Sequence, residues 1–491
     1  MLNWITELPV LLPWLVILPM LWALLSLAMG GSLHRWLAAL AIVALLLVTA
    51  AILVQWLHLG DLYYEMGGWS VPLGIALRLD GVALLLVLLT SLIISICALH
   101  AGTYLKDYPR AGIYFWPLLA FCWTSLNVIW LSDDLFNLYV GLELLGLSAV
   151  GLVALTGKAE ALAAALRYLY AALLGSLAYL LGVALLYSHY GQLDLNSLAE
   201  VFTADLPGLA ALALMTLGLL LKTAAFPLHS WLPPAHANAL PPVSALLSGL
   251  VAKASFYILV RLWLELAEGS LLPSAAQLLG VLGAGAVFWG GWMACRQQEL
   301  KMLVAYSTVA QLGYLLLLFP LVVGTSEEAA RLAWQGGWLQ LTSHALAKAA
   351  MFLAAGNLVL AMGRPDLPGL HGVGRYLPFS LLGFGLAGVS LMGLPPSGGF
   401  MAKWLLLQSA FISGQWWWVL VLLSGSALSA IYIFKVYQQC YIESGDVDRF
   451  RHPAWVLDLS ALALALMALS LGILSAWPQW LINTAFPGGA G

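Results

Sequence analysis

The sequence LPGLAALALMTLGLLLKTAAFPLHSWLPP occupies residues 206–234. Its apolar part, residues 206–226, is long enough to cross a hydrocarbon core about 30 Å thick as a helix. This apolar part nevertheless contains Lys222, and Pro227 directly follows its last residue. An ammonium group in lipid is costly, and proline removes a backbone donor and breaks a helix. This stretch therefore predicts an interrupted membrane span beside a functional charge.

Similar apolar runs recur along the whole chain. Of its 491 residues, 63% are hydrophobic and only 8% are charged, whereas about a quarter of the residues of a soluble domain carry charge. The 22 tryptophans fit a membrane protein, because indole rings favour the membrane–water boundary. We count about 14 runs of spanning length between residues 11 and 477. The sequence therefore predicts an all-α membrane protein with a single polytopic domain, residues 1–491.

Charge and cysteine content exclude several functions. A net charge of −3 leaves no basic surface for nucleic acid. The four cysteines (Cys97, Cys122, Cys295 and Cys440) form no CxxC pair, so we expect dispersed structural thiols. The sequence contains no haem motif and no nucleotide loop. We therefore expect no cofactor, no metal and no catalytic redox site in this chain, and we leave open whether it serves an enzyme.

The basic residues of the predicted loops are distributed unevenly. With an even number of spans both termini lie on one side, and the loops of that side hold only Arg78, Arg261 and Arg331. The loops of the opposite side hold Arg35, Lys106, Arg110, Lys158, Arg296, Arg364, Arg375, Arg449 and Arg451. Because basic loops stay in the cytoplasm, both termini are predicted on the non-cytoplasmic side of a bacterial-type inner membrane.

One predicted external loop, between Asp61 and Asp80, has a pattern of its own. Apolar residues alternate with small or polar residues from position 73 to position 80. Alternation with a period of two is typical of a strand. We therefore expect a short strand, or a hairpin, outside the membrane.

Seven basic residues fall within or at the ends of predicted spans. They are Arg167, Lys222, Lys253, Lys301, Lys348, Lys403 and Lys435, and Glu143 is the one acidic residue clearly inside a span. A long basic side chain near a helix end can extend to the interface, and we interpret Arg167, Lys301 and Lys435 in this way. The other four lysines have more apolar sequence around them. A charge there costs at least ~2.5–3.5 kcal/mol, so its presence indicates function.

Lys403 lies near a second helix breaker. It follows Pro395-Pro396-Ser397-Gly398-Gly399, much as Lys222 precedes Pro227. Irregular backbone at membrane depth is tolerated only where protein or water surrounds it. Two interrupted spans at corresponding places in two halves are typical of transporters built from internal repeats. The alternative is a plain proline kink in each span.

Histidines and hydroxyl groups accompany the buried lysines. His344 and Lys348 are four residues apart and share one helix face, and a neutral imidazole can both accept and donate a proton. His229 and His236 flank a Trp-Leu-Pro-Pro turn, where either relay or packing explains them. Hydroxyl side chains such as Ser307 can hold water or allow close helix packing.

This set of residues suits proton transfer better than metal-cation transfer. Low dielectric disfavours a charged lysine, and a carboxylate about 4 Å away stabilises it by about 4 kcal/mol at an effective dielectric near 20. Moving Glu143 toward or away from Lys222 would therefore switch the lysine between holding and releasing its proton. Hard cations are coordinated by several carboxylate or carbonyl oxygens, and charged lysines repel them. The excess of buried lysine over buried acid favours protons.

Five stretches resemble the antiporter-like membrane subunits of respiratory complex I, membrane-bound hydrogenases and Mrp-type cation/proton antiporters. They are LKTAAFPLHSWLPP (221–234), PVSALLSGLVAK (242–253), KMLVAYSTVAQLGY (301–314), HALAKAAMFLAAG (344–356) and PPSGGFMAK (395–403). The resemblance covers most of the chain. The D-type Mrp subunit, or a similar short member, is the nearest description, since the long lateral helix of the largest complex I subunit is not expected here.

The resemblance implies two inverted five-helix repeats, approximately residues 112–265 and 272–440, with two discontinuous helices and a charged axis across the middle of the membrane. Glu143 and Lys222 would form the regulating pair, and Lys403 the terminal group. Lys253, His344 and Lys348 would form the central relay. The accessory candidates are His229, Lys301, Ser307, Gln311 and Lys435. Gln311 departs from the family, because many members have histidine there.

We therefore expect a proton-conducting subunit of a multi-subunit complex, coupled to cation/proton antiport. The alternative is a proton-pumping subunit of a complex I-like or hydrogenase-type redox complex. In both cases the partners are other integral membrane subunits and the lipid bilayer, the transported ion is the proton, and any Na⁺ would be handled by partner subunits. A third hypothesis is a structural scaffold. It does not explain why lysines are kept within the membrane, where a charged side chain is energetically costly.

Overall fold

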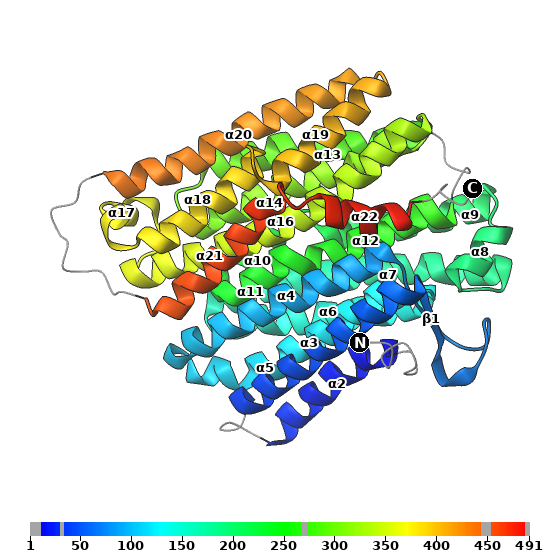
Figure 1. Ribbon diagram of the computed structural model, residues 1–491, viewed down its shortest axis with the longest axis horizontal. Helices are drawn as coiled ribbons and strands as arrows, with labels where there is room; N and C mark the ends of the chain where they lie inside the picture. The colour runs from blue at the N-terminus through cyan, green and yellow to red at the C-terminus, as the bar shows by residue number, and fades with distance from the viewer. Residues whose placement is uncertain (1–10, 30–33, 268–272, 443–452, 487–491) are drawn as a thin grey trace.

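The computed structural model describes residues 11–29, 34–267, 273–442 and 453–486. Within these ranges the chain is almost entirely helical, and the helices lie side by side in one bundle (Figure 1). In the described part, twelve helices are long and apolar enough to cross a membrane, and two shorter apolar helices span Pro378–Met392 and Trp455–Ser470. The predicted all-α membrane fold is confirmed. The count of about 14 spans stays a prediction.

Three helices and a hairpin precede the central part of the chain. The helices are α2 (Leu12–Met29), α3 (His34–Leu59) and α4 (Gly81–Tyr104). Strands β1 (Leu62–Glu65) and β2 (Ala76–Leu79) pair antiparallel, with Leu62 opposite Leu79. Figure 1 shows this hairpin projecting from one end of the bundle. The predicted strand or hairpin is confirmed, although the paired strand begins at Ala76 rather than at position 73.

The first half of the central part consists of five spans, one of which is interrupted. Its elements are α5 (Pro109–Leu131), α6 (Leu135–Ala154), α7 (Ala159–Tyr190), α8 (Leu195–Val201), α9 (Leu206–Thr223), α10 (Leu232–Asn238), α11 (Pro241–Leu246), η3 (Leu247–Val251), α12 (Ala252–Arg261) and η4 (Leu262–Leu266). The last four form one continuous and almost completely buried helix. Within it η3 and η4 are π-helical, a geometry frequent at functional sites.

The second half of the central part repeats this order of long helices. Its elements are α13 (Pro273–Arg296), α14 (Leu300–Leu316), α15 (Leu318–Val322), α16 (Glu327–Met362), α17 (Val373–Tyr376), α18 (Pro378–Met392), α19 (Gly398–Ile412) and α20 (Trp416–Tyr441), followed by α21 (Trp455–Ser470) and α22 (Ala476–Thr484). Helix α16 packs on α19 as α7 packs on α9. The repeats 112–265 and 272–440 stay a prediction, and residue 272 lies outside the described residues.

Both spans that carry a lysine beside a helix breaker are interrupted. Helix α9 ends at Thr223, Ala224 adopts a left-handed φ of 58°, and the helix resumes at α10. Helix α18 ends at Met392, Gly393 has a φ of 78°, and α19 begins at Gly398. Proline without an N–H and a residue in left-handed conformation explain why neither helix continues. The predicted interruptions are therefore confirmed.

Short polar side chains fix where the helices begin. Asp80, Asp134, Asp194, Asp205, Ser326 and Ser397 each accept a hydrogen bond from a backbone N–H in the first turn of α4, α6, α8, α9, α16 and α19. Such caps satisfy donors that the helix itself leaves free. The N–H of Gly208 also lowers the pKa of Asp205, outside the membrane-spanning segment.

Arg331 and Arg261, which were predicted in loops, both lie in helices. Arg331 lies in the first turns of α16, which begins at Glu327 rather than at the predicted residue 334. Arg261 lies in α12 with a residue exposure of 3%. Its guanidinium pairs with the buried Asp133 carboxylate, so the charge is neutralised within the protein. Arg449 and Arg451, which contributed to the predicted charge asymmetry, lie outside the described residues.

Candidate functional site

Glu143 and Lys222 form an ion pair between α6 and α9. Lys222 Nζ lies 3.6 Å from Glu143 Oε1, and the side chains are 24% exposed for Glu143 and 7% exposed for Lys222. The ammonium also donates to the Leu142 carbonyl at 3.4 Å. Ser176 of α7 donates its hydroxyl to the Glu143 carboxylate. Three helices therefore hold one carboxylate against one lysine.

Small residues make this contact possible. A Cβ added to Gly218 of α9 would lie 2.3 Å from the carbonyl oxygen of Gly175 in α7, and one added to Gly175 would lie 3.0 Å from Lys222 Cγ. The two backbones consequently approach as closely as glycine allows, which is typical of helix pairs in membranes. The Lys222 side chain passes through the space that a larger residue at position 175 would fill.

A small cavity adjoins Lys222 on the side of the central helix. Its volume is about 20 Å³, and Lys222, Gly146, Tyr168 and Ser255 are among its lining residues. That volume is enough for about one water molecule. Ser255 belongs to α12 and lies 2.8 Å (Oγ to Oγ1) from Thr223, the residue after Lys222. Hydroxyl groups thus connect the ion pair to the helix that carries Lys253.

Lys253 and Lys348 lie in the centre of the protein with exposures of 1% and 0%. Lys253 donates to the Ser248 carbonyl within the π-helical segment η3. Lys348 Nζ donates to the Val304 carbonyl at 3.0 Å and to the Ser307 hydroxyl. Neither ammonium is paired with a carboxylate in the described part of the chain. Oxygen dipoles alone therefore stabilise these two lysines.

His344 lies among the buried lysines. It is 1% exposed, and neither ring nitrogen has a hydrogen-bond partner among the described residues. The imidazole interacts electrostatically with Lys253, Lys348 and Lys403. The structure thus places the predicted relay residues near an imidazole that has no hydrogen-bond partner among the described residues.

His236 occupies a similar place, although the sequence alone favours neither relay nor packing for it. It is fully buried, its ring nitrogens are unpartnered within the described ranges, and its ring stacks on Phe352 with centroids 4.7 Å apart. It interacts electrostatically with Lys301, Lys348 and Lys253. Only its position after the helix break distinguished it in the sequence. His229, by contrast, is 8% exposed and stacks on Phe226.

Lys403 lies at the broken end of α18, inside a cage of oxygen atoms. Its Nζ donates to the carbonyls of Leu391 and Met392 at 2.9 and 3.3 Å, and to Ser426 Oγ at 2.9 Å. The Tyr314 ring also faces it, with its centroid 4.6 Å from Nζ. The C-terminal end of a helix carries partial negative charge. The interruption of α18 therefore creates the site for this lysine.

Gln311 connects this terminal lysine to the neighbouring helices α16 and α20. Its amide donates to the Leu391 carbonyl at 3.2 Å, the same oxygen that accepts from Lys403, and to Ser429 Oγ at 3.2 Å. Gln340 in turn donates to Gln311 Oε1 at 3.0 Å. A glutamine at this position thus maintains a polar connection, although an amide lacks the proton-accepting nitrogen of histidine.

Two accessory lysines bind the ends of helices. Lys301 Nζ donates to the Ala237 carbonyl at 3.1 Å and to the Ala239 carbonyl, at the end of α10. Lys435 Nζ donates to the carbonyls of Cys295 and Gln297 at 2.9 and 2.7 Å, at the end of α13. The interpretation that Lys301 extends to the interface is wrong, because the residue is only 8% exposed. Arg167 is exposed, in agreement with that interpretation.

Comparison with known proteins places the chain in a family. Residues 132–429 match the family "NADH:quinone oxidoreductase/Mrp antiporter, TM". The chain is 36% identical over 413 residues to the N subunit of the NADH-quinone oxidoreductase of Desulforudis audaxviator, covering 83% of this chain and 80% of the relative. It is 29% identical over 441 residues to the D subunit of the Na⁺/H⁺ antiporter of Alkalihalophilus pseudofirmus, covering 89% and 86% respectively.

A solved structure agrees with this assignment. A chain of the Mrp complex from Dietzia sp. matches with a TM-score of 0.86 and 25% identity over 96% of each chain. The family match covers both interrupted helices, the ion pair and the central lysines described above. The chain is therefore a multi-pass membrane protein and a member of the NADH:quinone oxidoreductase/Mrp antiporter transmembrane family.

Proposed function

We propose that this protein is a proton-conducting antiporter-like subunit of a multi-subunit membrane complex, coupled to cation/proton antiport. The observation that carries the proposal is a single ion pair, Glu143–Lys222 at 3.6 Å, followed by three buried lysines (Lys253, Lys348 and Lys403) that have no carboxylate partner among the described residues. A charged group of this kind is rarely kept in a membrane protein without a function.

The ion pair acts as the switch of the path. With Glu143 in contact, Lys222 is stabilised as an ammonium; when the carboxylate moves away, the lysine loses that stabilisation and releases its proton. The cavity beside Lys222 is large enough for about one water. That water, with the Thr223–Ser255 hydroxyl pair, offers the proton a route toward α12.

The central residues pass the proton to the second half of the protein. Lys253, His344 and Lys348 form the relay, since neither ring nitrogen of His344 has a hydrogen-bond partner among the described residues and an imidazole can accept and donate a proton. Lys403 is the terminal group, since its ammonium lies at the broken end of α18. Ser307, a partner of Lys348, and Gln311, next to Lys403, are accessory groups. Lys301 and Lys435, which bind carbonyls at nearby helix ends, and His229, which stacks on Phe226, are also accessory.

A second function is favoured by one comparison. The relative at 36% identity is named as the N subunit of an NADH-quinone oxidoreductase, so the same path could serve a proton-pumping redox complex. In either case the electron carriers would belong to partner subunits of the complex.

The two functions are distinguished by what drives proton movement. Everted membrane vesicles are energised through the respiratory chain and followed with a pH-sensitive dye, and NaCl or KCl is then added. Salt-dependent collapse of the proton gradient that requires this chain supports antiport. Proton uptake that requires both this chain and an electron donor to its own complex supports the redox alternative. Vesicles that behave identically with and without the chain would contradict both.

We further propose the arrangement in the membrane. The twelve long helices, the interrupted α18–α19 unit and α21 give about 14 spans, with two inverted repeats near residues 112–265 and 272–440. Both termini lie on the non-cytoplasmic side of the inner membrane, as loop charge predicts. Thiol labelling of a cysteine introduced near the C-terminus tests the orientation, and labelling only from the cytoplasmic side would refute it.

A further inference from the structure

A basic cavity lies far from the buried lysines, at the end of the bundle opposite the hairpin. It has a volume of about 300 Å³ and is bounded by the start of α3, the α4–α5 turn and the start of α5. Its lining includes His34, Arg35, Lys106, Pro109, Ile113 and Trp116. That volume is at the lower end of the range for small-molecule sites, about 300–1,000 Å³.

The polar groups of the cavity are free to bind an anion. His34 is 3% exposed, and both ring nitrogens lack a hydrogen-bond partner within the described ranges. A buried imidazole without a partner is unusual, because buried polar groups are normally hydrogen-bonded. Arg35 and Lys106 are exposed, and no carboxylate pairs with either in the part of the chain that the structure describes. Two positive charges and one open imidazole therefore face this cavity.

The backbone at the cavity adds to the attraction. Helix α5 begins here at Pro109, and no side chain caps its first turn. Helix α3 begins here at His34. The N-terminal ends of helices carry partial positive charge and free N–H groups. The N-terminal end of α5 therefore favours an anion, in agreement with the charge of the side chains.

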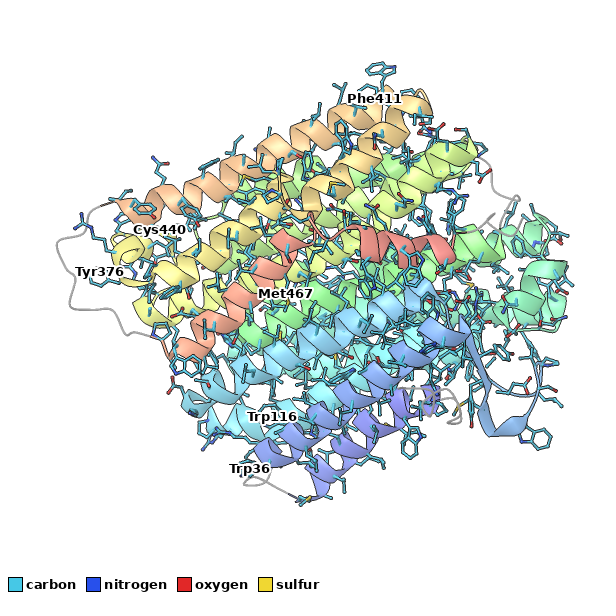
Figure 2. All side chains as sticks on the ribbon, in the orientation of Figure 1. Trp36, Trp116, Tyr376, Phe411, Cys440 and Met467 are labelled. Carbon is cyan, nitrogen blue, oxygen red and sulfur yellow. The ribbon has the colours of Figure 1, made fainter. Side chains whose placement is uncertain are left out.

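The other lining residues identify the kind of anion. Ile113 and Trp116 of α5 supply apolar surface beside the charges, and Ile113 is 43% exposed. Trp36, which follows Arg35, is 77% exposed, and Figure 2 shows Trp36 and Trp116 toward the same end of the bundle. Exposed tryptophan next to basic residues is typical of the membrane boundary. A ligand here would have a phosphate in contact with the basic groups and apolar chains in contact with lipid.

We infer that this cavity binds the phosphate-bearing headgroup of an anionic phospholipid. Basic pockets between membrane helices bind such headgroups elsewhere. A free phosphate shares the headgroup chemistry but would gain nothing from the apolar lining. The site is separate from the proton path and does not depend on the proposed function.

The inference is tested by lipid retention. The full chain, purified in its complex in mild detergent, is incubated with phosphatidylglycerol or cardiolipin, and with phosphatidylcholine for comparison. Bound lipid is counted by native mass spectrometry. The variant is Arg35→Gln/Lys106→Gln. The matched control is Arg110→Gln, because Arg110 is an exposed arginine of the same turn that does not line the cavity.

The double variant should lose roughly 30-fold in apparent affinity for the anionic lipids, equivalent to about 2 kcal/mol for two charges. The Arg110→Gln control should stay close to wild type, and phosphatidylcholine should bind weakly to all three. Equal retention by wild type and the double variant would overturn the inference. So would an equal loss in the control, which would indicate a diffuse surface charge. Full displacement of the lipid by millimolar inorganic phosphate would also overturn it, since the ligand would then be a free anion.

Discussion

Replacing Glu143 with alanine should strongly slow proton movement while leaving the protein in the membrane. The reason is the environment of Lys222, whose side chain is 7% exposed and whose carboxylate partner lies 3.6 Å away. Two unit charges at that distance attract by about 4.6 kcal/mol at an effective dielectric of about 20. Without Glu143, the charged form of Lys222 loses this stabilisation.

The magnitude follows from the same geometry. A loss of about 4.6 kcal/mol corresponds to a change of roughly 2,000-fold in the equilibrium between charged and neutral Lys222, at about 1.4 kcal/mol per factor of ten. Glu143 is 24% exposed, so water screens part of the attraction. If screening halves the attraction, about 2.3 kcal/mol remains, which corresponds to a change of roughly 40-fold in the same equilibrium. We therefore expect transport to fall between about 40-fold and about 2,000-fold.

Everted vesicles with a pH-sensitive dye provide the assay, with an immunoblot for subunit abundance. Glu143→Asp should retain partial activity, and Lys222→Ala should resemble Glu143→Ala. Ser176→Ala removes one hydrogen bond to the carboxylate but keeps both charges, so its loss should be smaller. Glu160→Ala, which removes an exposed carboxylate from α7, is the control. Normal proton movement at normal abundance in Glu143→Ala would refute the switch, and loss of the protein itself would indicate a structural anchor.

Three further predictions follow from other contacts. Tyr314→Leu should slow transport several-fold and Tyr314→Phe should not, because the ring 4.6 Å from Lys403 contributes about 0.5–2 kcal/mol; equal rates in the two vesicle preparations would contradict this. Asp133→Ala should destabilise the protein by about 1–3 kcal/mol, since it removes one of the two carboxylates that pair with the buried Arg261 guanidinium and leaves an N–H donor without a partner; an unchanged melting temperature in detergent would argue against it. Gly218→Val should separate α7 from α9 and abolish transport, because a Cβ there lies 2.3 Å from a backbone oxygen; wild-type dye quenching would show that the helices tolerate the separation.

The sequence was sufficient to predict the broken helices. Pro227 and Pro395-Pro396 lack backbone donors whatever surrounds them, so the interruptions near Lys222 and Lys403 follow from covalent structure. The membrane class follows in the same way from composition. The Glu143–Lys222 contact could be predicted because Glu143 was the one acidic residue clearly inside a span.

The partners of the other lysines could not be predicted. Lys348 contacts Val304, 44 positions away, and Lys403 contacts Ser426 of the next helix, α20. Such contacts depend on how the helices are rotated and shifted against one another, which the apolar periodicity of buried spans does not define. A backbone carbonyl also has no signature in the sequence, since every residue supplies one.

The error at Arg261 has a related cause. A basic residue near the end of an apolar run usually belongs to a loop, where its side chain reaches water and needs no protein partner. Arg261 was expected to behave in this way. Its partner, Asp133, lies 128 positions earlier and is itself buried. Lys301 was misinterpreted for the same reason, because the end of α10 supplies its carbonyl partners. In both cases tertiary contacts replaced the expected solvent.

The most direct test of proton conduction through the buried axis is dye-monitored proton movement in vesicles that contain the complex with Lys348→Met. Lys348 is fully buried at the centre of the path, whereas Lys158 is an exposed lysine at the start of α7. At equal subunit abundance, Lys348→Met should lose proton movement and Lys158→Met should keep it. Wild-type proton movement in Lys348→Met would contradict the proposal that protons cross the membrane through this axis.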